Sequence, residues 1–491
     1  MYWVTTKLTI ISGLFFSAGL ATGSTLELSE AEVVTRIKNV HPSIVREQLE
    51  ANIKQQAVPA ALAAFDVTAY GTAQFSDDDY KKPLTAFTTS RRLDQQVVSA
   101  EIGFKKKFTT GTEVTMSVDG TNMRSTDVEQ YSGGQMDTEV NAVIGLSFRQ
   151  PLLRGMSARS EQAAVDEAEA TVQAAEHQVE SKILRTVAEG LRSFWELYRA
   201  DAQIKLHADA RDNAQTILSR AKLLAAEGKL SAVDIIDAEA LVLERQSRLV
   251  SSRAQREVVH HELRLMLDEQ DEDIQIKIAD LPSRTAPPLV HDLDAYAQGI
   301  LQNWPGYLRA QAQLKAEDAR IIRAEDALLP KLDLIAGVNK RGSESSIRAG
   351  VKDTVTSSDR SIYVGLTLEM PLQGNRQADA VRQAAELRKQ QAELDMRQIA
   401  RRLTTDLKQR LAEAQQAYDQ WQLARDNLTL SQSRYEKYYQ SFQAGRTSVV
   451  ELSDIEASLM RARENVEDKH VSYQLTLVSL RLVDGTLLGN S

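Results

Sequence analysis

Two pairs of carboxylates stand at matching places in the two halves of this chain. Asp234 and Asp237 follow Gly228, and Glu451 and Asp454 follow Gly445 at the same spacing. Residues three apart share a helix face, so each pair places two negative charges together. Such acids either cap a helix and complement its dipole or line a negatively charged constriction that favours cations. Both roles fit the sequence.

Long helices must position these acids. Residues 158–226 and 375–444 contain no proline and only one interior glycine, Gly190, and strong helix formers dominate them. Gly228 and Gly445 suit the left-handed residue that ends a helix. Ser231 with Asp234, and Ser448 with Glu451, predict capping boxes that start the return helices 231–268 and 448–487. The exposed turns that a partner could meet comprise Gly228, Lys229, Leu230, Ser231, Gly445, Arg446, Thr447 and Ser448. Shorter helices at 42–58 and 305–328 could extend the return helices.

Several segments alternate between apolar and polar residues. They are 65–75, 98–108, 112–120, 140–148, 331–339 and 361–370. Their length, roughly 9–11 residues, is that of a tilted transmembrane β-strand, although half-buried soluble strands also alternate. A tight turn at 109–111 contrasts with long polar loops at 76–96, 121–139 and 340–360. Because an open sheet edge is not tolerated in lipid, a few strands per chain predict an oligomer.

Composition excludes several function classes. The net charge of −9 and a pI near 5.5 leave no basic surface for nucleic acid. The absence of cysteine excludes disulfides, a thiol nucleophile, a Cys-based metal site and a lipidated N-terminal Cys. No phosphate loop, nucleophile elbow or zinc-binding helix motif is present, and the adjacent His260 and His261 do not share a helix face. The sequence therefore predicts neither an enzyme nor a cofactor or metal site.

The N-terminus is typical of a secretory signal. Lys7 precedes an apolar run from Leu8 to Leu20, and small residues follow, so residues 1–23 are expected to be a cleaved signal peptide. The rest of the chain repeats one plan, with repeat 1 at 24–280 and repeat 2 at 281–491. Pro42 returns as Pro305, and the strand-to-helix junction at Pro151 returns as Pro371.

These features together resemble the TolC-type outer-membrane channels. The resemblance covers nearly the whole mature chain and includes junctions 150–152 and 370–372, the 329–332 entry into a strand, the 445–454 turn and the closing 480–489 segment. It implies an α+β membrane protein, a homotrimeric outer-membrane β-barrel continued by a long periplasmic α-helical barrel. Such a protein is the exit duct of a tripartite efflux pump or type I secretion system. Its helix tips dock on a periplasmic adaptor protein, which links it to an inner-membrane transporter.

The resemblance also suggests roles for the acids. Glu451 and Asp454 match the paired acids of the family's second tip, with Glu in place of the expected Asp at 451. Asp234 matches an acid of the first tip, and Asp237 has weaker precedent. Together they would form a periplasmic gate.

Two alternatives remain open. The family implies four strands per protomer, but this chain offers six candidates, because repeat 1 contains an additional hairpin at 98–120. This hairpin either widens the barrel, with Lys106 reaching the interface from a strand end, or folds outside a four-stranded set. A periplasmic coiled-coil adaptor or scaffold would share the long helices, but it would not need strands of membrane-spanning length.

Overall fold

The chain forms two compact units, each drawing on both sequence repeats. The computed structural model describes residues 25–81, 92–134, 138–279, 286–288, 290, 292–344, 353–354, 356, 359–372 and 374–488. The strand unit comprises residues 45–182 and 292–405, and the reversal unit comprises 1–44, 183–291 and 406–491. The compact units therefore do not follow the repeat boundary near residue 280. The expected signal peptide lies outside the described residues.

The strand unit contains six long strands and the helices that follow or precede them. The strands are β2 (Val67–Lys81), β3 (Arg92–Lys107), β4 (Glu113–Ser125), β5 (Thr138–Pro151), β7 (Lys331–Glu344) and β8 (Arg360–Glu369). The helices are most of α2 (Pro42–Gln55), α3 (Ala57–Leu62), α4 (Thr126–Tyr131), α7 (Leu293–Leu301), α8 (Pro305–Leu328) and the first parts of α5 (Arg159–Ala226) and α10 (Arg376–Gln443), with the 3-10 turns η1 (Ala63–Phe65) and η2 (Met156–Ala158).

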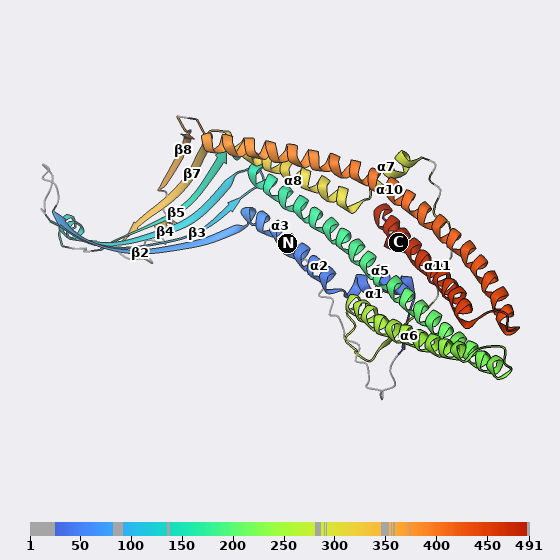
Figure 1. Ribbon diagram of the computed structural model, residues 1–491. Coiled ribbons are helices and arrows are strands. Elements are labelled where there is room, and N and C mark those ends of the chain that lie inside the picture. The colour runs from blue at the N-terminus through green and yellow to red at the C-terminus, as the bar shows by residue number, and fades with distance from the viewer. Residues whose placement is uncertain are drawn as a thin grey trace. The chain divides into compact units, whose positions relative to one another are not determined.

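The six strands form one antiparallel sheet in the order β2-β3-β4-β5-β7-β8 (Figure 1). The hairpin formed by β3 and β4 lies inside this sheet, between β2 and β5. The alternative in which it folds outside a four-stranded set is therefore wrong. The turn at 109–111 is tight, since the Gly111 N–H donates to the Phe108 carbonyl at 2.8 Å and Gly111 has a φ of +83°.

The strands run further than their alternating patterns. β2 continues to Lys81 and β3 begins at Arg92, inside a segment expected to be a loop. Likewise, β4 reaches Ser125, β5 begins at Thr138 and β7 reaches Glu344. Alternation reports only that one face is buried, whereas backbone pairing continues through polar residues such as Asp77 and Asp79.

The reversal unit is helical. It contains α1 (Glu30–Val40), α6 (Ala232–Met266), α11 (Val449–Asp484), the later parts of α5 and α10, the 3-10 turn η3 (Thr486–Leu488) and two short strands, β1 (Thr25–Leu28) and β6 (Gln275–Ile278). β1 and β6 pair in parallel. A core around the fully buried Phe194 and Trp195 joins α1, α5, α6 and α11. At Gly190 a Cβ would lie 1.9 Å from Ile37 Cδ1, so any larger residue would require the buried Ile37 side chain to move.

The helix bounds lie close to those expected. α5 and α10 each have 68 residues, and each contributes residues to both units. The segment expected as one helix at 42–58 is divided into α2 and α3, whereas α8 spans 305–328 as expected. Among the described residues, no helix is both long and apolar enough to cross a bilayer.

Candidate functional site

The two helix reversals of the reversal unit have the same backbone geometry. Gly228 and Gly445 both have a φ of +72°, the left-handed conformation expected from the sequence. After α5, the Lys229 N–H donates to the Leu224 carbonyl at 2.9 Å, and after α10 the Arg446 N–H donates to the Ser441 carbonyl at 3.0 Å. These bonds satisfy helix carbonyls that the reversal would otherwise leave unpaired.

The reversals lie side by side on a small apolar core. This core contains Leu224 of α5, Leu241 of α6, Phe442 of α10 and Leu452 of α11, and Leu230 packs against it. Thr447 is buried, whereas Lys229, Ser231, Arg446 and Ser448 are exposed. The predicted docking turns are therefore held by their apolar residues and present their charged and hydroxyl side chains to solvent.

Asp234 has a structural role. Its carboxylate accepts hydrogen bonds from the Ser231 hydroxyl at 2.7 Å and the Ser231 N–H at 2.9 Å, while the Asp234 N–H donates to Ser231 Oγ. The other oxygen accepts from the Val449 N–H, 3.4 Å away at the start of α11. These bonds to Ser231 hold the pKa of Asp234 below its usual value. The first capping box is complete, and its acid also links the starts of the two return helices.

The second capping box is incomplete, contrary to expectation. Ser448 Oγ accepts from the Glu451 N–H at 3.2 Å, but the Glu451 carboxylate does not return a bond to Ser448. Within the described part of the chain, the carboxylates of Asp237, Glu451 and Asp454 make no hydrogen bond or ion pair. Glu451 and Asp454 are exposed and Asp237 is half-buried. Three acids at neighbouring helix starts thus remain available to solvent ions.

The strand-to-helix junctions are fixed by polar contacts. β5 ends at Pro151, and the Gly155 N–H then donates to both oxygens of the buried Asp326 carboxylate at 3.0 and 3.1 Å. After Pro371, Asn375 Oδ1 accepts from the Ala378 N–H at 3.2 Å and so caps α10. Both prolines therefore stand where a strand ends before a long helix, as expected.

The sheet has two chemically different faces. The register places one set of large hydrophobic residues on a single face, and they are 36–72% exposed in the single chain. They include Val67, Phe75, Val98, Ile102, Phe104, Met116, Val118, Phe148, Val338, Ile362, Val364, Leu366 and Leu368. The opposite face carries polar residues such as Tyr70, whose hydroxyl donates to Glu101 at 2.7 Å. An exposed apolar band this wide is suited to lipid.

Lys106 tests the placement of the hairpin. It pairs with Val67 and Val114 and so lies on the apolar face, as assumed in the alternative in which the hairpin widens the barrel. Its Nζ lies 5.3 Å from the Phe108 ring centroid, beyond the strand end. Lys105 and Lys107 lie on the polar face, where they form ion pairs with Glu113 and Glu161. Only one of the three lysines therefore needs to reach the bilayer interface.

Sequence reasoning missed the contacts between distant helices. Arg245 of α6 and Glu456 of α11 form a buried ion pair, and Arg256 of α6 donates to Asp201 of α5 at 2.8 Å. No local motif marks these residues. Their partners lie far away in sequence, so a single helical pattern does not reveal them.

The chain is similar to known outer-membrane proteins. The sequence model of the outer membrane efflux protein family matches residues 113–268 and 297–486. The probable outer membrane lipoprotein SilC of Salmonella typhimurium is 27% identical over 184 residues, which span 37% of this chain and 38% of that protein.

Solved structures share the fold over almost the whole chain. The structure of CusC covers 97% of this chain and 96% of its own, with a TM-score of 0.68 and 16% identity. The outer membrane protein VceC of Vibrio cholerae covers 93% and 96%, with a TM-score of 0.65 and 13% identity. The alternative of a periplasmic adaptor or scaffold does not agree with the family match. This chain belongs to the outer membrane efflux protein family.

Proposed function

We propose that this protein is the outer-membrane exit duct of a tripartite efflux pump. The observation that carries the proposal is the sheet, whose one face is a continuous exposed apolar band and whose other face is polar. Such a sheet is stable in lipid only as the wall of a closed, water-filled barrel. The long helices α5 and α10 follow the sheet directly and end in the paired reversals.

The duct is proposed to be a homotrimer. β2 and β8 each have one neighbour in the sheet, so each leaves a row of backbone N–H and C=O groups without a strand partner. Pairing β8 of one copy with β2 of the next satisfies both edges, and three copies would close a barrel of eighteen strands, six from each chain. The reversals, which point charged side chains to solvent, would meet the periplasmic adaptor that links the duct to its inner-membrane transporter.

Reconstitution tests the duct function. The full chain, purified in mild detergent, is expected to have the mass of three copies and to conduct ions in planar lipid bilayers. A monodisperse monomer that does not conduct would overturn the proposal.

The adaptor site is tested separately, by Gly228→Trp. No atom lies within 4 Å of a Cβ at Gly228, so the turn has room for the new side chain, although the φ of +72° strains any residue other than glycine there. We expect conductance to remain while efflux in cells is lost, whereas retained efflux would remove this turn from the adaptor interface.

A further inference from the structure

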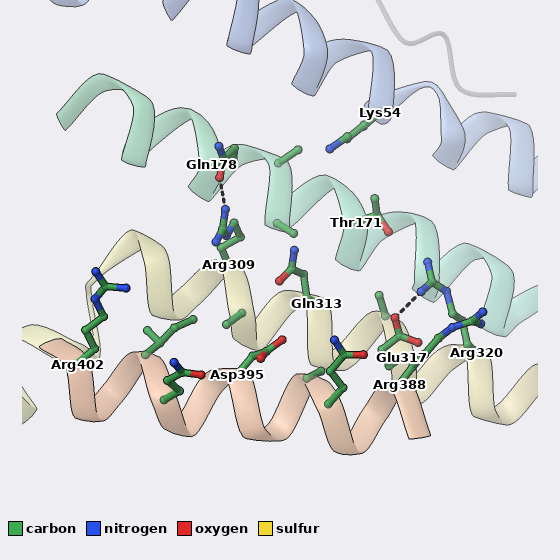
Figure 2. Close-up of a pocket in the computed structure, with 18 of the residues that line it drawn as sticks. Lys54, Thr171, Gln178, Arg309, Gln313, Glu317, Arg320, Arg388, Asp395 and Arg402 are labelled. Carbon is green, nitrogen blue, oxygen red and sulfur yellow. Dashed lines mark hydrogen bonds and ion pairs between the residues drawn. The ribbon is translucent and has the colours of Figure 1, made fainter. Parts of the chain in front are cut away.

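A pocket of about 740 Å³ lies in the strand unit among α2, α5, α8 and α10 (Figure 2). Residues of all four helices line it. α5 and α8 are joined by Arg320 and Glu167 at 2.7 Å, and α8 and α10 by Asp318 and Lys389 at 2.8 Å.

Basic side chains outnumber acidic ones in the lining of the pocket. Lys54, Arg309, Arg320, Arg388 and Arg402 line it, against three carboxylates, Glu47, Glu317 and Asp395. This excess of cations contrasts with the net charge of −9 for the whole chain. Alanines on α5, α8 and α10 provide the space between these long side chains.

Several of these cations are not neutralised by the protein. Arg320 is held by Glu167 and Glu317. Arg309, in contrast, donates only to the neutral Gln178 side chain, and its Nε is buried without a partner among the described residues. Lys54 and Arg388 make no hydrogen bond or ion pair within the described part of the chain. Lys54 and Arg388 are exposed, but a buried Arg309 donor without an acceptor, in a pocket lined by further cations, favours an anionic ligand.

The spacing of the cations indicates the kind of anion. Arg388 and Arg402 are on one helix, 14 residues apart, which corresponds to about 21 Å along its axis. Figure 2 shows them towards opposite ends of the pocket, with Arg309 and Gln178 between α5 and α8. One small anion does not reach both ends, whereas a molecule with several oxyanion groups, or a succession of anions, does.

We propose that this pocket is a transit site for molecules that carry several carboxylate or phosphate groups. The inference rests on the duct function proposed above, because it requires the pocket to line the route. Three copies would place three such pockets around one axis, and the resulting field would raise the local concentration of anionic substrates.

Block of the reconstituted channel by tripolyphosphate tests the site. We expect Arg309→Gln and Arg388→Gln each to raise the half-blocking concentration by about tenfold, the loss of one charge-assisted contact. Arg397→Gln is the matched control, since Arg397 is exposed on α10 but does not line the pocket. Arg388→Lys, which keeps the charge, should retain most of the block.

The outcomes separate the two proposals. A wild-type protein that does not conduct overturns the duct, while calorimetric binding of tripolyphosphate to the detergent-solubilised chain still tests the pocket. If wild-type protein shows no binding, or if the two Gln variants bind and block as the wild type does, the anion site is overturned. If Arg397→Gln weakens the tripolyphosphate block as much as the two pocket variants do, the block depends on general surface charge. That result would also overturn the anion site.

Discussion

Arg245 of α6 and Glu456 of α11 form an ion pair whose side chains are only 4% and 2% exposed. Arg245 Nε and Glu456 Oε1 have no hydrogen-bond partner among the described residues. Burial raises the pKa of Glu456, and the neighbouring guanidinium opposes this rise. The pair joins the two return helices, but each member would be strongly unfavourable without the other.

Removing one partner of this pair should destabilise both helices. We expect Glu456→Ala to lower the free energy of opening of α6 and α11 by up to about 3–5 kcal/mol, because the buried Arg245 would keep only the exposed Glu244, 3.3 Å from its Nη1. Amide hydrogen exchange along the two helices measures this loss. Glu239→Ala breaks the exposed pair between α6 and Lys222 and should cost less than about 1 kcal/mol. If amide hydrogen exchange along the two helices is similar in both variants, the buried pair does not dominate their stability.

The two reversal glycines should respond unequally to alanine. Both have a φ of +72°, so either substitution costs about 1–2 kcal/mol of backbone strain. At Gly445, however, the new Cβ would also lie 3.2 Å from Lys229 Cβ, whereas Gly228 has open space. Hydrogen exchange near the turns should therefore increase more in Gly445→Ala than in Gly228→Ala. The reverse order would show that the turns do not pack together.

The Asp234 cap should depend on pH. Hydrogen bonds from Ser231 place the folded pKa below the ordinary value of 3.8, so the unfolded chain takes up the proton first. The stabilisation is complete above the unfolded pKa and is lost as pH falls through the folded pKa. Asp234→Ala should destabilise the start of α6 by about 1 kcal/mol near neutral pH. This difference from the wild type should disappear in strong acid, and a difference that grows on acidification would contradict the cap.

The unpaired acids should bind cations in the assembled channel. A ring of carboxylates in a narrow pore holds divalent ions most strongly. Replacing both Glu451 and Asp454 by Ala should therefore weaken block of the single-channel current by divalent cations. Glu239→Ala is the control, because this carboxylate on α6 pairs with Lys222 at 3.0 Å. If block by divalent cations is unchanged in the double variant, Glu451 and Asp454 only stabilise the start of their helix.

Single cysteines can distinguish the faces of the hairpin, because the chain has none of its own. Cysteines at Ile102 and Met116, on the apolar face, should react with lipid-soluble but not with aqueous thiol reagents. Cysteines at Ser99 and Thr115, on the polar face of the same strands, should show the opposite preference. Ready aqueous labelling at Ile102 would exclude contact with lipid.

Local sequence signals predicted the elements well. Alternation located all six strands of the large sheet, and the Gly228 and Gly445 turns have the expected conformation. The strand ends were wrong where polar residues such as Asp79 continue the pairing. The local pattern also predicted a complete capping box at Ser448 and Glu451. The Glu451 carboxylate does not bond back to Ser448, so this prediction was wrong.

These local signals could not predict which residues make contacts between helices. The long helices each carry several Arg and Glu residues, and only the packing decides which become buried, as Arg245 does, and which line a pocket, as Arg388 does. The short strands β1 and β6, with four residues each, are too brief to show alternation.

The position of the hairpin has an evolutionary consequence. β3 and β4 lie inside the sheet, between β2 and β5, so neither is one of the two edge strands β2 and β8, and neither leads directly into α5 or α10. A duplication or loss of such a hairpin would change the circumference of a barrel by two strands per subunit while preserving both seams and both helix attachments. Pore width could thus diversify among relatives through one internal insertion, without a compensating change at the subunit boundary.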